Sequence, residues 1–260
     1  DEDSRDITSF STDAGSFRFK RLPFGLKIAP NSFQRMMSIA FSGLTPEKAF
    51  VYMDDLVIIA STEKRMIQNL NDVFQLCKKY NLKLNPDKCT FFNNEVTYLG
   101  HKCTSDGLMP DDSKIEIIKN YPRPTDADSA RRFIAFCNYF RRFIKNFAHH
   151  ARLITYLTKK NIKFVWTEEC ENAFNYLKNA LMNKPILQYP DYSKEFVIIT
   201  DASKYACGAI LSQNQNNMLM PIAYASRSFT KGESNKSVIE QELAAIHWAC
   251  LLYTSDAADE

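Results

Sequence analysis

Long apolar runs, paired cysteines and a large net charge are all absent from this sequence. No uninterrupted apolar stretch approaches the roughly 18 residues that a membrane-spanning helix needs, and the start Asp1-Glu2-Asp3-Ser4, with three acids, is unlike a secretory signal. The 7 cysteines are scattered, odd in number and form no Cys-x-x-Cys pair, which favours reduced, mostly structural thiols. These absences predict a soluble intracellular protein without a targeting signal.

A basic stretch stands out against the small net charge of +3. Residues 121–165 contain ten lysines and arginines but only two acids, Asp126 and Asp128. Such a cluster is typical of a surface that binds nucleic-acid phosphates, because each neutralised phosphate releases condensed counterions. A solvated helix face has the same pattern, so charge alone leaves both interpretations open.

The spacing of apolar residues predicts a mixed α/β (α+β) fold, and 260 residues with 45% hydrophobic content can fill one large core or two modest ones. Helices are expected from Pro30 onward and at residues 63–80, 110–147, 168–182 and 238–252. Strands are expected at residues 16–20, 49–53, 56–60, 82–92, 95–103, 196–200, 207–212 and 222–225. Within 110–147, Thr125 and Asp128 have capping-box spacing for a helix that buries Phe133, Cys137, Phe140 and Ile144.

Two adjacent aspartates, Asp54 and Asp55, separate the apolar runs 49–53 and 56–60, which predicts a hairpin with an acidic turn. Carboxylates at a strand tip can hold a divalent ion near a phosphate, since Mg²⁺ prefers oxygen ligands. Asp-Asp turns are also common on ordinary surfaces. The apolar flanks favour a functional site over a casual surface loop.

The motifs around this hairpin resemble those of reverse transcriptases. Tyr52-Met53-Asp54-Asp55 is similar to the family's active-site signature, and residues 22–34 look like the motif that precedes it. Residues 84–89 and 98–101 match the next two motifs in order. The Pro-Phe-Gly-Leu form and residues 138–144 resemble gypsy-type LTR retrotransposon Pol polyproteins more than retroviruses.

This resemblance implies an RNA-directed DNA polymerase. Asp54 and Asp55 would join an aspartate from an earlier motif to hold two Mg²⁺, with Mn²⁺ as an alternative ion. Nucleotide or template contacts are implied for Phe24, Gly25, Gln34 and Lys88, although ordinary surface polarity is an alternative for Gln34 and Lys88. Primer contacts are implied for Tyr98, Leu99, Gly100 and His101. In the basic stretch, contacts with the nucleic-acid backbone are expected from Arg131, Arg132, Arg141, Arg142 and Lys145.

A second resemblance begins near residues 164–166 and includes residues 200–203 and 240–246. These look like the first two acidic positions of a ribonuclease H domain fused to such polymerases. Asp201 and Glu242 would then contribute to a two-metal site that hydrolyses the RNA strand of an RNA/DNA hybrid. The motif match prefers Glu242 to Glu240, and a solvated helix glutamate is the alternative.

Together the resemblances imply a partial palm and thumb followed by a partial ribonuclease H-like domain. The expected divisions are residues 1–104 for the palm with residual fingers, 105–163 for a helical thumb or connection, 164–250 for the ribonuclease H-like domain and 251–260 for a tail unlike the family. The first palm aspartate is expected before residue 1 and the later ribonuclease H carboxylates beyond residue 250. We therefore expect the isolated chain to be inactive, with no catalytic role for Asp256 or Asp259.

The implied partners are nucleic acids and the rest of the Pol polyprotein, without a membrane. They comprise an RNA or DNA template, a DNA primer, dNTPs and an RNA/DNA hybrid. The implied location is a cytoplasmic retroelement particle. An alternative of a different class is a template-primer binding fragment of a degenerate element, without chemistry of its own.

Overall fold

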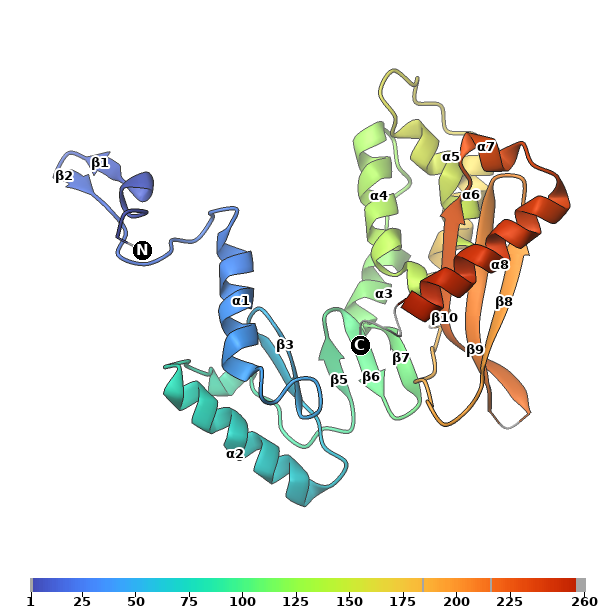
Figure 1. The fold of residues 1–260 in the computed structure, drawn as a ribbon. Helices are drawn as coiled ribbons and strands as arrows, with labels where there is room; N and C mark the ends of the chain where they lie inside the picture. Colours follow the sequence, from blue (N-terminus) through green and yellow to red (C-terminus); the bar gives the residue numbers. More distant parts are fainter. Residues whose placement is uncertain (1, 184, 216, 256–260) are drawn as a thin grey trace. The chain divides into compact units, whose positions relative to one another are not determined.

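The computed structural model describes residues 2–183, 185–215 and 217–255 of the chain (Figure 1). It divides into two compact units, Asp1–Asn93 and Asn94–Glu260, and each is described by itself. The predicted tail lies outside the described residues from residue 256 onward, and with it Asp256 and Asp259. Within the described ranges, no helix has both the length and the apolar character needed to cross a membrane.

The first unit is built on the hairpin of β3 (Ala49–Tyr52) and β4 (Asp55–Ile58). Helix α1 (Ala29–Phe41) contacts β3, and α2 (Glu63–Lys79) contacts β4. Their buried side chains form one core, which consists of Met37, Ala40, Phe41, Leu44, Ala49, Val73 and Cys77. Preceding these elements along the chain are η1 (Asp6–Thr8) and a two-stranded ribbon of β1 (Phe10–Thr12) and β2 (Gly15–Phe17).

The predicted helix 63–80 is confirmed, and its start is capped because the Thr62 side chain accepts a hydrogen bond from Arg65 N at 3.3 Å. The predicted strand 82–92 is wrong. That segment contains only the single turn η2 (Pro86–Lys88), where the Asn85 side chain accepts from Asp87 N. Pro86 has no N–H to donate to a neighbouring strand, so the motif forms a capped turn instead.

The second unit begins with a three-stranded antiparallel sheet of β5 (Val96–Tyr98), β6 (His101–Thr104) and β7 (Gly107–Pro110). The predicted strand 95–103 is therefore two strands with a turn between them. Helical elements follow: α3 (Asp112–Lys119), α4 (Ala127–Tyr139), η3 (Arg141–Phe143), α5 (Phe147–Leu157) and α6 (Glu168–Met182). The predicted helix 168–182 is confirmed.

The start of α4 differs by one residue from the prediction. Asp126, not Thr125, is the cap, and it forms a capping box with Ser129 rather than with Asp128. The Ser129 hydroxyl accepts a hydrogen bond from Asp126 N, as the side chain of the expected acid would do. The sequence spacing did not reveal this cap. The predicted burial is confirmed for all four apolar side chains, Phe133, Cys137, Phe140 and Ile144.

A second sheet has the order β10-β9-β8, formed by β8 (Phe196–Ala202), β9 (Ala206–Gln215) and β10 (Met218–Ser228). All its pairings are antiparallel, and each strand extends beyond the predicted run. Helix α5 packs against β9 and β10. After the short α7 (Lys231–Ser234), α8 (Val238–Ser255) crosses the sheet and contacts β8 and β9 (Figure 1).

A backbone bridge joins β7 to the segment before β8. Leu108 N donates to Leu187 O at 2.8 Å, and Leu187 N donates back to Leu108 O at 2.9 Å. Gly107 permits this approach, because a Cβ at that position would lie 2.3 Å from Leu187 O and its φ of +137° disfavours other residues. The first strands of the unit are thereby fastened to its C-terminal half.

Candidate active sites

The acidic turn in the first unit is a tight two-residue hairpin. Tyr52 pairs with Asp55 across the ladder, so Met53 and Asp54 occupy the turn and Asp55 begins β4. Met53 has a φ of +51°, because a two-residue hairpin loop requires left-handed backbone. The predicted turn was Asp54-Asp55, so its position shifts by one residue. The carboxylates consequently extend from the turn and from the first position of the strand.

Two hydrogen bonds of the Gln34 side chain, on α1, hold the backbone of this turn. Its Oε1 accepts a hydrogen bond from Met53 N, and its Nε2 donates to Val51 O at 3.3 Å. One amide thus supplies both an acceptor and a donor to the hairpin backbone. The sequence motif suggested a nucleotide or template contact for Gln34, whereas in the structure its polar atoms are engaged with the hairpin.

Asp54 and Asp55 are both exposed, so their oxygens are accessible to a ligand. Carboxylate oxygens are suitable donors for a hard divalent cation. Among the described residues, however, no group of three or more His, Cys, Asp or Glu could hold a metal ion. The pair therefore fits part of a metal site in its chemistry and leaves coordination positions for other groups.

The other predicted residues of this unit are less constrained. The Phe24 side chain is fully exposed, and Gly25 has a φ of +87°. Lys88 is exposed at the end of η2. These three residues are accessible to a ligand, but the structure does not bring them into the hydrogen-bonded group around the hairpin.

In the second unit, the predicted primer-binding residues form the tight turn between β5 and β6. Tyr98 pairs with His101, while Leu99 and Gly100 occupy the turn with φ of +48° and +71°. The Tyr139 hydroxyl donates to Leu99 O at 2.6 Å. The His101 ring packs against the rings of Tyr139, Phe140 and Phe143, and its Nδ1 lies 2.8 Å from Leu99 O.

Burial is the main reason that the pKa of His101 lies below its ordinary value of about 6.5; the hydrogen bond with Leu99 opposes this effect and nearby Arg142 adds to it. The unfolded chain therefore takes up this proton first as the pH falls. The stability that neutral His101 contributes is present above its ordinary pKa and is lost as the pH drops below that value.

We expect His101→Phe to reduce the fall in melting temperature between pH 7.5 and pH 5.5. Phenylalanine keeps the aromatic packing but cannot be protonated. His247→Phe is the matched control, because His247 is exposed on α8. An unchanged pH dependence in His101→Phe, measured by thermal denaturation, would show that another group governs this loss of stability.

The two carboxylates predicted for a ribonuclease H-like site lie near the end of β8, where Asp201 belongs to the strand and Glu242 of α8 contacts the next residue. Asp201 is exposed near the end of the strand and accepts a hydrogen bond from Asn146 Nδ2 at 3.3 Å. Glu242 Oε1 accepts from Ala202 N at 3.4 Å. Glu240 instead caps the start of α8, where Ser237 N and Oγ both donate to its Oε2. These hydrogen bonds lower the pKa of Glu240.

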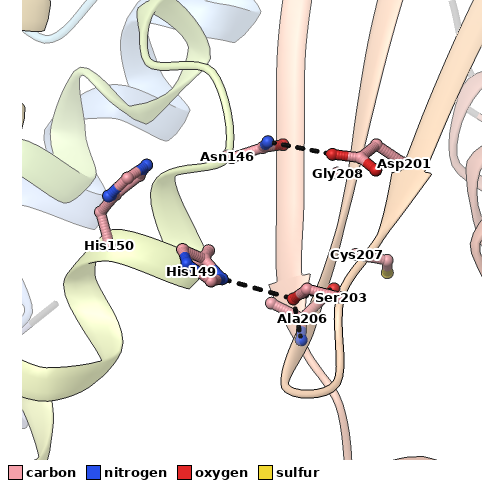
Figure 2. Close-up of a pocket in the computed structure, with 8 residues that line it drawn as sticks. All are labelled: Asn146, His149, His150, Asp201, Ser203, Ala206, Cys207 and Gly208. Atoms are coloured by element: carbon pink, nitrogen blue, oxygen red, sulfur yellow. Dashed lines mark hydrogen bonds between the residues drawn. The ribbon is translucent and has the colours of Figure 1, made fainter.

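Asp201 lines a cavity of about 240 Å³ together with residues from the segment before and within α5 (Figure 2). Its lining consists of Asn146, His149, His150, Asp201, Ser203, Ala206, Cys207 and Gly208. The sequence motifs did not identify Asn146 or His149, which precede Asp201 by about fifty residues. The one sequence signal was an asparagine directly before a helix, a residue type that tolerates left-handed backbone.

The residues predicted to contact the nucleic-acid backbone differ in their surroundings. Arg141 donates to Ser226 O and lies over the Phe147 ring, so it fastens η3 to β10. Arg131 pairs with Asp128 and donates to Thr158 O. The side chains of Arg132, Arg142 and Lys145 are exposed. These last three are the residues of the set that are most accessible to phosphates.

Two family models match separate parts of the chain. Residues 1–103 match the model described as reverse transcriptase (RNA-dependent DNA polymerase), and residues 166–255 match the RNase H-like domain found in reverse transcriptase. Enzymes of both families generally use divalent metals.

Curated relatives match almost the whole chain. The retrovirus-related Pol polyprotein from transposon 412 of Drosophila melanogaster is 68% identical over 251 residues, which cover 96% of this chain and 20% of the relative. The corresponding polyprotein from transposon gypsy of the same organism is 36% identical, with coverage of 95% and 25%. The chain therefore spans about a fifth to a quarter of these relatives.

Solved structures share the fold. The foamy viral protease-reverse transcriptase described as dRH, in complex with double-stranded DNA, has a TM-score of 0.84 at 23% identity, covering 98% of this chain and 45% of that one. The foamy viral protease-reverse transcriptase without the dRH designation, in complex with an RNA/DNA hybrid, has a TM-score of 0.77 at 24% identity, with coverage of 96% and 34%.

Proposed function

Because the chain belongs to the reverse transcriptase and ribonuclease H region of the Pol polyproteins of gypsy-type LTR retrotransposons, we propose that it supplies catalytic residues for both activities of such a polyprotein. The observation that carries the proposal is the hairpin with Asp54 and Asp55 exposed at its tip, within the segment that matches the reverse transcriptase family.

At the polymerase site, Asp54 and Asp55 would hold two Mg²⁺, or Mn²⁺, together with a further carboxylate. Bound there, the ions supply charge neutralisation for the triphosphate and lower the pKa of the primer 3′ hydroxyl. The chain's own contribution is geometric. Gln34 fixes the backbone on both sides of Tyr52, so the two carboxylates keep their separation and direction while substrate binds.

At the ribonuclease H site, Asp201 and Glu242 would hold the same kind of ion beside the RNA strand of a hybrid. Their carboxylates come from a strand and from a helix that packs on it, so packing of α8 against β8 sets their relative position. The partners of the two sites would be an RNA or DNA template, a DNA primer, dNTPs and an RNA/DNA hybrid. The proposed location is a cytoplasmic particle with the rest of Pol.

The domain divisions expected from the sequence belong to the same proposal: a palm with residual fingers over 1–104, a thumb or connection over 105–163 and a ribonuclease H-like domain over 164–250. Within that scheme, Phe24, Gly25 and Lys88 would contact the nucleotide or template. Residues 98–101 would contact the primer through their exposed atoms.

Primer extension on an RNA template and cleavage of an RNA/DNA hybrid test the proposed function, when both are measured for the polyprotein that contains this chain. Absence of both activities would favour a template-primer binding role without chemistry. The specific observation in favour of that second role is the exposure of the basic side chains Arg132, Arg142 and Lys145, which are accessible to phosphates.

The exposed basic residues give a prediction for binding. Binding of a primed template by the chain is expected to weaken as the salt concentration rises. In the Arg142→Gln, Lys145→Gln double variant, the slope of the logarithm of the binding constant against the logarithm of salt concentration should flatten by about 1.8 for B-form DNA, because each phosphate contact contributes about 0.9. Arg141→Gln is the contrasting variant. Because the Arg141 side chain donates to Ser226 O, this substitution should lower the melting temperature and change the slope little.

Fluorescence anisotropy across a salt series measures these slopes. Equal slopes for the parent and the double variant, with equal melting temperatures, would rule out phosphate contacts by Arg142 and Lys145.

A further inference from the structure

Asn146 reaches Asp201 from outside the sheet. It precedes α5 and has left-handed backbone, with φ of 52° and ψ of 35°, a conformation that asparagine adopts more readily than most residues. Its side chain extends to β8, where Nδ2 donates to Asp201 Oδ2 at 3.3 Å (Figure 2). It is the one side chain in the described part of the chain that forms a hydrogen bond with this carboxylate.

Gly208 makes room for this contact. It pairs with Asp201 across the β8–β9 ladder, and a Cβ at this position would lie 2.1 Å from Asn146 Oδ1. Any side chain at position 208 would therefore displace the Asn146 amide. The strand that neighbours Asp201 is shaped to admit Asn146.

Neighbouring contacts hold Asn146 in this place. Ala148 N donates to Ser226 Oγ at 2.9 Å, and Ser226 is buried in β10. His149 Nδ1 lies 3.3 Å from Ser203 Oγ, directly after β8. The start of α5 is thus attached to both outer strands of the sheet, which restricts the position of the Asn146 side chain.

We infer that Asn146 is a positioning residue for Asp201, supplied to the ribonuclease H-like site by the helical segment that precedes it. Carboxylates that bind metals are commonly oriented by outer hydrogen-bond partners, and loss of such a partner costs about 10- to 100-fold in metal affinity. Donation to Oδ2 restricts rotation of the carboxylate and leaves Oδ1 for a cation. The inference rests on the proposed metal-binding role of Asp201.

Mn²⁺ binding to the full chain, measured by electron paramagnetic resonance, tests the inference. Asp54→Asn and Asp55→Asn are included throughout, so that the binding observed belongs to the second unit. In this background Asn146→Gly removes the amide but keeps a residue that favours left-handed backbone, and it should weaken Mn²⁺ binding by about 10- to 100-fold. Asn161→Gly is the matched control, because Asn161 is exposed with a φ of +63°.

Asp201→Asn in the same background separates the inference from the proposal on which it rests. If it leaves Mn²⁺ binding unchanged, the metal site fails and the role of Asn146 fails with it. If Asp201→Asn abolishes binding while Asn146→Gly binds like Asn161→Gly, the positioning role alone is overturned. Should Asn146→Gly melt below the assay temperature, Gly208→Ala takes its place; weakened binding supports the role, and parental affinity overturns it.

Discussion

Asp54→Asn or Asp55→Asn, introduced into the Pol polyprotein that contains this chain, is expected to lower nucleotide incorporation by about 10³-fold or more. A metal ion stabilises transition-state charge by several kcal/mol, and each loss of about 1.4 kcal/mol lowers the rate tenfold. The amide has nearly the shape of the carboxylate but lacks the charge that holds the ion. Single-nucleotide incorporation on a primed RNA template measures the effect.

Template-primer affinity should change little in these variants, since neither carboxylate is needed to contact the duplex backbone. Asp13→Asn is the matched control, because Asp13 is an exposed aspartate in the turn between β1 and β2. Incorporation at the parental rate by Asp54→Asn or Asp55→Asn would remove that residue from the proposed metal site.

Asp201→Asn and Glu242→Gln are each expected to lower cleavage of the RNA strand of a hybrid by about 10³-fold while sparing polymerisation, for the same electrostatic reason. Glu240→Gln is the matched control. It lies on the same helix but is bonded to Ser237, so it should affect stability rather than cleavage. Both activities are measured on one preparation of the polyprotein.

Loss of both activities from one of these substitutions, with the fold intact, would contradict the independence of the two sites. Equal cleavage by Glu242→Gln and Glu240→Gln would instead show that Glu242 is an ordinary helix glutamate.

The sequence predicted the elements that local patterns determine. The helices at 63–79 and 168–182 have strong apolar periodicity, and β3 and β4 are apolar runs separated by a polar turn. The segment 82–92 was misassigned because its apolar residues suggested a strand, whereas Asn85 and Pro86 favour a capped turn. In that segment, hydrogen bonding of the Asn85 side chain to the backbone competes with strand pairing and favours the turn.

The residues of the candidate sites also differ in whether a local sequence pattern identifies them. Asp54, Asp55, Asp201 and Glu242 were identified from motifs that are contiguous in the sequence. Asn146 was not, because its contact with Asp201 spans 55 residues and depends on how α5 packs against the sheet. Arg141 belonged to a basic stretch whose charge suggested solvent exposure, but its partner, Ser226 O, lies 85 residues away.

The bridge between β7 and Leu187 has a consequence for synthesis of the chain. Beside it, Gln188 Nε2 donates to Asp106 O across 82 residues. At about 5–20 residues per second, a ribosome needs about 4–16 s to make that interval. Until Leu187 has been synthesised, Leu108 of the β6–β7 hairpin lacks the residue to which its backbone is hydrogen-bonded. The second unit therefore completes this part of its packing only after residues 187 and 188 have been synthesised.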